Sequence, residues 1–283
     1  MKFTDIKGII LDMDGVLWRG NELLPGMHEL FQWIREHQLS YALATNNSSR
    51  TPDDYVVKLQ QAGVDGISAE RVVTSGTATA AYLQTKYPAG TRVHVFGMPG
   101  LHRIMENAGF DVYSDKQPEV VVVGIKFDMT YDQLSQTCLY IRAGAEFVGT
   151  NPDTTFPTPQ GLTPGVGTMI AAVRTATDVE PTIIGKPGKH MFNTALAITQ
   201  TAPEETLMVG DRLDTDILGG QQAGMKAALL LTGVTSADEL SNPNNEIWPD
   251  VAFDGLPELL KTWAGDRWYR EKERDNRRAS QQG

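Results

Sequence analysis

Two carboxylates stand two residues apart directly after a short apolar run. Asp12 and Asp14 follow Gly8–Leu11, which is typical of a buried strand, and Gly15 then supplies a turn. Residues i and i+2 of a strand point to the same side, and two anions this close repel each other unless a cation or a proton intervenes. Asp12 and Asp14 are therefore the first candidates for a site; the alternative is a strand that ends in a polar turn.

A second acidic cluster lies far along the chain, in Gly210–Asp216. Asp211 directly follows the apolar run Leu207–Val209, as Asp12 follows its own run. Together with Asp12 and Asp14, Asp211 makes a set of hard oxygen ligands suited to Mg²⁺, which binds few carboxylates and keeps several waters. The sequence predicts a magnesium site, against the alternative of a solvated helix start.

A cation and a polar loop accompany these acids. Lys186 lies in Gly185-Lys186-Pro187, and Thr45-Asn46-Asn47 follows an apolar run. A carboxylate beside Mg²⁺ can attack phosphorus and form an aspartyl-phosphate, and such transfer depends mainly on positioning and charge neutralisation. We expect Lys186 and the polar loop to neutralise the phosphoryl oxygens, and a protonated Asp14 to supply the proton of the leaving alkoxide.

The elements that must position these residues alternate regularly. Apolar runs predict strands at 6–11, 41–44, 72–74, 182–184, 207–209 and 227–231, and helical patterns lie at 27–34, 51–63 and 214–223. Strands that alternate with helices form parallel βαβ units with helices on both faces of a sheet. Ligands bind beyond the carboxyl ends of such strands. The four motifs above each follow a strand, so we expect them to converge at one edge.

A long insertion separates the second motif from the third. Strands are expected at 92–96, 120–123 and 147–150, helices at 101–108, 130–143 and 168–176, and a turn-rich segment at 151–165. We predict a discontinuous core of residues 1–77 and 181–265, an inserted α/β domain of residues 78–180, and a charged tail of residues 266–283. We read the tail as a solvated helix or a frayed end, with a partner-binding segment as the alternative.

Composition narrows the class of protein. The chain has 283 residues, of which 41% are hydrophobic and 21% charged, as in ordinary globular proteins. Its net charge of −10 argues against nucleic acid as a partner. The single cysteine, Cys138, fits a reducing compartment and has the apolar spacing of a buried structural thiol. No apolar run approaches the ~20 residues of a membrane span, so we expect a cytoplasmic protein without a membrane partner.

The motifs resemble a known family. In order, Asp12-Met13-Asp14-Gly15-Val16, Thr45-Asn46, Gly185-Lys186-Pro187 and Gly210–Asp216 resemble the four motifs of the haloacid dehalogenase superfamily phosphatases. The insertion looks like the type-two cap of the NagD-like and nitrophenylphosphatase-like branch. The segments 46–48, 150–153 and 161–165 are similar to that branch in particular. The resemblance covers residues 6–263 and leaves the charged tail outside it.

The resemblance implies a Rossmann-like, doubly wound parallel sheet core and a cap that closes over the substrate. It implies that Asp12 is the nucleophile and a metal ligand, and that Asp14 is the general acid–base and gives the metal its backbone carbonyl. Asp211 would be the other carboxylate ligand. Asp216 would not bind the metal itself but would orient waters or Lys186. The phosphate would be held by Thr45, Asn46, Asn47 and Lys186.

The function implied is that of a Mg²⁺-dependent phosphatase of small phosphomonoesters, such as sugar phosphates, nucleoside monophosphates, phosphoglycolate or pyridoxal phosphate. By analogy, the cap loop 153–161, with Asp153, Phe156 and Gln160, would select the substrate; the alternative is a rigid Pro-rich turn. Caps of this kind often support homodimers. Two other classes stay open: a phosphotransferase or mutase with the same aspartyl-phosphate, and a non-catalytic cation-binding module.

Overall fold

The structure is a computed structural model that describes residues 3–158 and 161–280. The chain divides into two compact units. Unit 1 comprises residues 1–44, 56–71 and 195–283, and unit 2 comprises residues 45–55 and 72–194. The core, cap and tail boundaries predicted from the sequence stay a prediction.

A parallel sheet is the centre of unit 1. Its strands include β1 (Gly8–Leu11), β4 (Ser40–Thr45), β12 (Thr206–Gly210), β13 (Lys226–Leu230) and β14 (Val251–Phe253), and the sheet has the order β14-β13-β12-β1-β4-β5, where β5 is Val72–Thr74. β1 pairs in parallel with both β12 and β4. The side chains of Ile9–Leu11 and Leu207–Val209 are fully buried, because parallel strands are covered on both faces. The predicted α/β fold is confirmed.

Unit 1 contains five α-helices among its described residues. They are α1 (Met27–Glu36), α8 (Leu218–Gln222), α9 (Ala237–Leu240), α10 (Leu256–Ala264) and α11 (Asp266–Ser280), while α2 (Pro52–Gln61) crosses the boundary between the units. A short hairpin joins β2 (Trp18–Arg19) to β3 (Glu22–Leu23). α1 buries Met27, Leu30, Phe31 and Ile34 at the helical spacing that predicted it.

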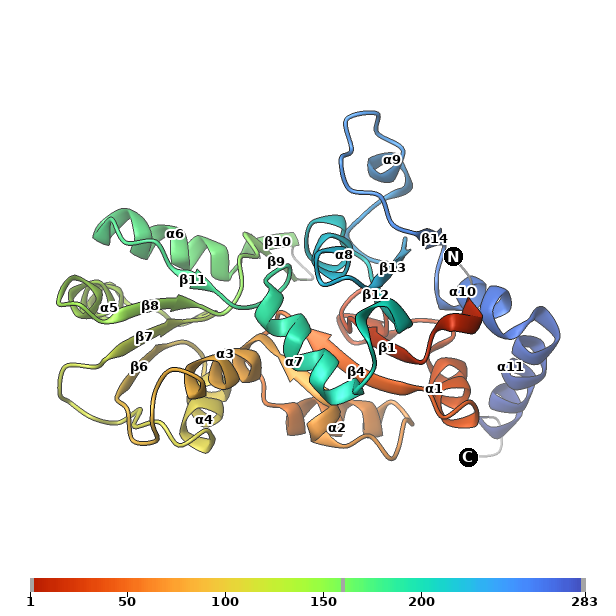
Figure 1. Cartoon of the computed structure of the whole chain (residues 1–283), viewed down its shortest axis with the longest axis horizontal. Coiled ribbons are helices and arrows are strands. Elements are labelled where there is room, and N and C mark those ends of the chain that lie inside the picture. Colours follow the sequence, from red (N-terminus) through yellow and green to blue (C-terminus); the bar gives the residue numbers. More distant parts are fainter. Residues whose placement is uncertain (1–2, 159–160, 281–283) are drawn as a thin grey trace. The chain divides into compact units, whose positions relative to one another are not determined.

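Residues 266–280 of the charged tail form a docked helix, α11. We expected a solvated helix or a frayed end, but α11 packs along α1 and α10 (Figure 1). Tyr269 is only 3% exposed. The Trp268 indole donates to Glu36, and the Asn276 amide donates to the buried Glu29 carboxylate at 2.9 Å. Only a few residues on one face of α11 make these contacts. The high charge of the segment therefore did not reveal that the helix packs against unit 1.

Unit 2 holds a second parallel sheet. Its order is β11-β8-β7-β6, from β6 (Val93–Phe96), β7 (Val120–Val123), β8 (Glu146–Gly149) and β11 (Thr182–Ile183). The helices α5 (Tyr131–Arg142) and α6 (Val166–Thr177) lie on one side of this sheet, and α3 (Ser75–Gln84) and α4 (Pro99–Asn107) lie on the other (Figure 1). A last helix, α7 (Lys189–Thr199), runs from unit 2 into unit 1.

Two expectations for unit 2 need correction. We expected residues 182–184 to join the core sheet, but β11 pairs with β8, with Thr182 opposite Val148. Residues 151–165 contain two paired antiparallel strands, β9 (Thr155–Thr158) and β10 (Gly161–Pro164), where we expected a turn-rich segment and named no strand. Proline is rare inside strands because it donates no ladder hydrogen bond, and a two-stranded ribbon tolerates it at an edge.

The apolar core of unit 2 contains the cysteine. Cys138 is buried with Val121, Ile141 and Phe147 between the sheet and its helices. Burial raises the pKa of its thiol, which makes the thiolate scarcer. The prediction of a buried structural thiol is confirmed.

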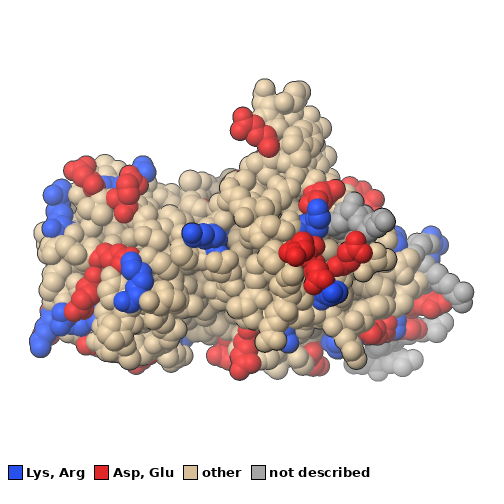
Figure 2. Space-filling view, in the orientation of Figure 1, with Lys and Arg blue, Asp and Glu red and all other residues tan. Residues whose placement is uncertain are grey.

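The surface carries charges of both signs. On the face drawn in Figure 2, groups of Lys and Arg alternate with groups of Asp and Glu, and the residues drawn in colour form no broad basic patch there. Among the described residues, none of the helices combines the length and the apolarity that crossing a membrane requires.

Candidate active site

An acidic cluster lies in unit 1 where neighbouring strands end. Leu11 of β1 is opposite Val209 of β12, so the residues that follow leave adjacent strands at the same level. The carboxylates of Asp12, Asp211 and Asp216 each offer an oxygen, and these oxygens all lie within 4.8 Å of one another. The three side chains are 6%, 2% and 0% exposed. The structure therefore brings Asp12 and Asp211 together, as the strand ends predicted, and adds Asp216.

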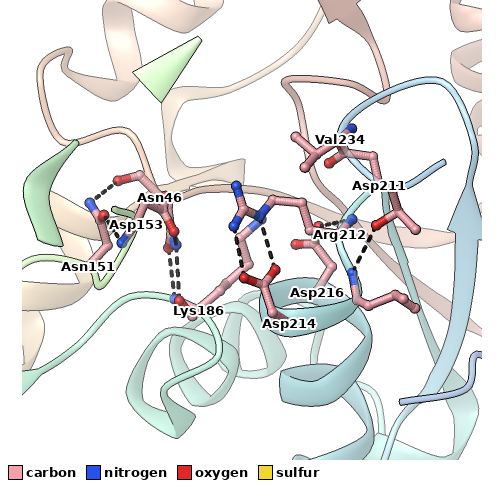
Figure 3. Close-up of polar contacts among 11 residues, drawn as sticks. Asn46, Asn151, Asp153, Lys186, Asp211, Arg212, Asp214, Asp216 and Val234 are labelled. Atoms are coloured by element: carbon pink, nitrogen blue, oxygen red, sulfur yellow. Dashed lines mark hydrogen bonds and ion pairs between the residues drawn. The ribbon is translucent and has the colours of Figure 1, made fainter. Parts of the chain in front are cut away.

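Two glycines leave room for the Asp211 carboxylate. A Cβ atom at Gly15 or at Gly233 would overlap the Asp211 side chain. Gly15 also has φ +85°, a conformation that side chains disfavour. The backbone N–H of Val234 donates to Asp211 Oδ2 at 2.6 Å (Figure 3). The Asp211 carboxylate thus occupies space that a side chain at position 15 or 233 would take.

Asp216 reaches the same place through an unusual turn. A single π-helical turn, Leu213–Ile217, begins after Arg212, and such turns are frequent at functional sites. The Arg212 N–H donates to Asp216 Oδ2 at 3.1 Å, and a Cβ at Gly210 would overlap Asp216. Asp214 points elsewhere, since its exposed carboxylate pairs with the Arg212 guanidinium at 2.9 and 3.1 Å (Figure 3).

The donor set of this cluster fits a hard divalent cation. Three carboxylates removed from water repel one another, and burial penalises their charged forms unless a cation compensates. Oxygen donors in this number suit Mg²⁺. The Asp216 carboxylate lies in the same group as those of Asp12 and Asp211, the two predicted carboxylate ligands. The resemblance had instead implied that Asp216 orients waters or Lys186 without binding the metal. The metal roles of Asp12, Asp14, Asp211 and Asp216 stay predictions.

The Asp14 side chain does not belong to this group of three carboxylates and has a hydrogen-bond partner of its own. Asp14 is exposed, and its Oδ1 accepts a hydrogen bond from Trp18 Nε1 at 2.9 Å. Trp18 was not among the residues that we expected at the site. Its only signal in the sequence is its position four residues after Asp14.

Unit 2 carries a polar cluster centred on Asn46. Its Oδ1 accepts the Lys186 N–H at 2.8 Å, and its Nδ2 donates to the Lys186 carbonyl at 3.0 Å and to Asp153 Oδ1 at 3.1 Å (Figure 3). The Asn46 carbonyl accepts hydrogen bonds from Asn151 and Ser75, both at 2.6 Å. The Asn46 amide therefore positions the Lys186 backbone, a role that the sequence did not reveal.

The neighbouring loop is shaped by its own side chains. Asn47 Oδ1 accepts the N–H and the hydroxyl of Ser49 at 2.9 and 2.7 Å. The Asn47 N–H in turn donates to Thr45 Oγ1 at 3.1 Å. Thr45 and Lys186 are each 2% exposed. That Thr45, Asn46, Asn47 and Lys186 hold a phosphate beside the acidic cluster stays a prediction.

The predicted selector loop is described only in part. Asp153 takes part in the cluster around Asn46. Phe156 belongs to β9, but its side chain is not among those described, and Gln160 lies outside the described residues. A role of these residues in choosing the substrate stays a prediction.

Comparison with models of protein families shows to which family the chain belongs. A family model of haloacid dehalogenase-like hydrolases matches residues 9–111, and a model of HAD-hydrolase-like proteins matches residues 183–259. These two ranges contain the residues of all four motifs. This chain belongs to the haloacid dehalogenase-like hydrolase family.

Relatives in this family are phosphatases by name. A dihydroxyacetone phosphatase of Corynebacterium glutamicum is 37% identical over 90% of this chain and 90% of its own length. An acid sugar phosphatase of Staphylococcus haemolyticus is 34% identical over 88% of this chain and 94% of its own. Our chain is accordingly an enzyme, a phosphatase of the haloacid dehalogenase-like family, and not a non-catalytic cation-binding module.

Solved structures of the family agree over nearly the whole chain. A 4-nitrophenylphosphatase from Thermotoga maritima is 34% identical, with a TM-score of 0.87 over 92% of this chain and 98% of that one. NagD from E. coli is 33% identical, with a TM-score of 0.81 over 90% and 98%. A glycerol phosphate phosphatase from Mycobacterium tuberculosis in complex with magnesium is 33% identical, with a TM-score of 0.82 over 91% and 77%. The chain is a member of the NagD-like and nitrophenylphosphatase-like branch.

Proposed function

We propose that the protein is a Mg²⁺-dependent phosphatase of small phosphomonoesters, with sugar phosphates as the first class to test. The observation that carries the proposal is the buried carboxylate cluster of Asp12, Asp211 and Asp216 at the ends of adjacent strands. The names of the relatives, which refer to a sugar, dihydroxyacetone and glycerol phosphate, support small polyol esters. Nucleoside monophosphates, phosphoglycolate and pyridoxal phosphate complete the panel.

In this proposal Asp12 is the nucleophile. One of its carboxylate oxygens forms a bond to phosphorus while the bond to the leaving oxygen breaks, and Asp14 gives that oxygen a proton. Water then attacks the phosphorus of the aspartyl-phosphate, Asp14 takes the proton back, and phosphate leaves Asp12. When bound by Asp12, Asp211, Asp216 and the Asp14 carbonyl, Mg²⁺ would neutralise the charge of the phosphoryl oxygens.

Unit 2 supplies the remaining charge in the proposal. The Lys186 ammonium and the loop Thr45–Asn47 hold the phosphoryl oxygens. The loop 153–161, with Asp153, Phe156 and Gln160, selects among esters. A homodimer formed through the inserted domain and a cytoplasmic location belong to the same proposal.

The decisive experiment compares Asp12→Asn with Asp214→Asn. Asp214 lies in the same motif as Asp211, but its carboxylate is exposed and paired with Arg212, so it is the matched control. Phosphate release from the ester panel should need Mg²⁺, stop with a chelator, and disappear in Asp12→Asn only. Normal turnover by the Asp12→Asn variant would exclude Asp12 as the nucleophile. Adding a sugar acceptor and analysing the products separates hydrolysis from phosphoryl transfer.

A further inference from the structure

We propose that Trp18 is a positioning residue for Asp14, because its indole N–H determines which oxygen of that carboxyl group exchanges a proton with the leaving group. The inference rests on the proposed function and refines its proton-transfer step. It follows from contacts within unit 1 alone.

The loop between Asp14 and Trp18 is closed by its own backbone. The Gly15 N–H donates to the Trp18 carbonyl at 2.7 Å, and the Leu17 N–H donates to the Met13 carbonyl at 2.8 Å. Asp14 and Trp18 are bridge partners across this loop. The Thr232 hydroxyl donates to the Gly15 carbonyl at 2.6 Å, which ties the loop to the chain beyond β13. Side chains at the two bridge positions are therefore held in fixed relation.

The hydrogen bond between these side chains has a defined direction. Trp18 is fully buried, and its Nε1 lies 2.9 Å from Asp14 Oδ1. An indole N–H only donates, so Oδ1 must accept whether or not Asp14 carries a proton. The proton of the acid is then carried on Oδ2. Without the indole donor, the carboxyl group turns freely, because the terminal torsion of aspartate is broad.

A lysine strengthens this arrangement. Lys58 Nζ lies 3.7 Å from the centroid of the Trp18 ring and donates to the Gly20 carbonyl at 3.0 Å. A cation over the face of an indole is attracted by the ring, and it draws electron density away from the N–H group. Lys58 therefore holds the ring in place and makes it a better donor to Asp14.

The chemical consequence concerns the leaving group. As the bond from phosphorus to the leaving oxygen breaks, the proton moves from Asp14 Oδ2 to that oxygen, and the attacking water returns one in the second step. An alkoxide leaves poorly without this proton, whereas nitrophenolate leaves with little help. A turning Asp14 should therefore slow alkyl esters selectively, which a general loss of structure would not do.

The test is Trp18→Phe, which keeps an aromatic ring and removes the donor. We expect kcat for glycerol phosphate to fall about 10-fold or more, and kcat for 4-nitrophenyl phosphate to fall less than about 2-fold, at unchanged Mg²⁺ dependence. Lys58→Met should give a smaller loss with the same selectivity. Trp33→Phe, a change of another buried tryptophan of unit 1, should alter neither rate.

A second substitution covers the case in which Trp18→Phe does not fold. Benzothienylalanine introduced at position 18 replaces the indole N–H by sulfur and keeps the shape of the ring, and it should reproduce the selective loss. Equal losses on both esters, or no loss, would overturn the inference while leaving the phosphatase proposal intact. A native enzyme that releases phosphate from neither ester would instead overturn the proposed function.

Discussion

The side-chain amide of Asn46 pairs with both polar backbone groups of Lys186. Oδ1 accepts the N–H and Nδ2 donates to the carbonyl, at 2.8 and 3.0 Å. An amide that bonds in this way fixes the course of the backbone and leaves the lysine side chain to act elsewhere. Asn46 therefore affects the proposed phosphate site through Lys186. Asp153 accepts a hydrogen bond from the same Nδ2 and so helps to orient the Asn46 amide.

Asn46→Asp tests this relationship. The carboxylate can accept the Lys186 N–H, but it cannot donate to the carbonyl and it repels Asp153. Loss of one buried hydrogen-bond partner costs about 2 kcal/mol, which is roughly 30-fold in a binding constant. We expect this loss to appear as an increase in KM and in the Ki of inorganic phosphate. Adding Asp153→Asn should restore part of the loss in a double-mutant cycle. Strict additivity of the two changes would show that the residues do not act together.

Gly15→Ala tests the gap that holds Asp211. Gly15 and Gly20 both have positive φ, +85° and +62°, but only at Gly15 would a Cβ meet Asp211, and nothing lies near Gly20. Both variants should lose about 1 kcal/mol of stability from backbone strain. Only Gly15→Ala should weaken activation by Mg²⁺, measured by titration of the rate with the metal. Equal metal dependence of the two variants would contradict the prediction.

His94 should make unit 2 sensitive to acid. Burial, and then the charge of His102, lower the pKa of His94 from 6.5 to about 4. Between these values the unfolded chain binds more protons than the folded one, so stability is full above pH 6.5 and falls by up to roughly 3 kcal/mol as the pH drops through 4. His94→Gln retains a partner for Thr137, which His94 Nε2 contacts at 3.1 Å. Urea unfolding should show a smaller loss between pH 7 and 4.5 in this variant, and an identical loss would refute the assignment.

The tail helix should contribute to the stability of unit 1. Tyr269 is 3% exposed, and Trp268 packs edge-on against Trp33 with ring centroids 4.9 Å apart. We expect Tyr269→Ala to cost about 3 kcal/mol, as for other large buried side chains, in the midpoint of denaturant unfolding. Asp275→Ala, at an exposed position of the same helix, should change the midpoint little. A similar effect of both would mean that the helix is not docked as described.

Much of the fold could be predicted because its central strands are mostly apolar. β1, β12 and, after the exposed Lys226, β13 are buried on both faces, and such runs stand out in any sequence. β11 has only two residues, Thr182 and Ile183, which is too short to indicate its sheet. The docking of α11 depends on a few residues of one face in a strongly charged segment, and charge hides such a face.

The site was predictable where chemistry follows strand ends. Asp12 and Asp211 were found by that reasoning, because parallel strands end at one edge. Trp18, Ser75 and Asn151 were missed, since they act through hydrogen bonds to Asp14 or to the Asn46 carbonyl. Neither spacing nor residue type shows such contacts before the loops are folded.

The pairing of β1 with β12 has a consequence for synthesis in the cell. β1 leaves the ribosome long before its neighbour β12 is made, because all the residues of unit 2 lie between the two strands in the sequence. Until then the apolar run Ile9–Leu11 has an open edge in the nascent chain, and long-range parallel pairing forms slowly. Cotranslational proteolysis should accordingly cut arrested chains that end before residue 206 far faster than the released protein.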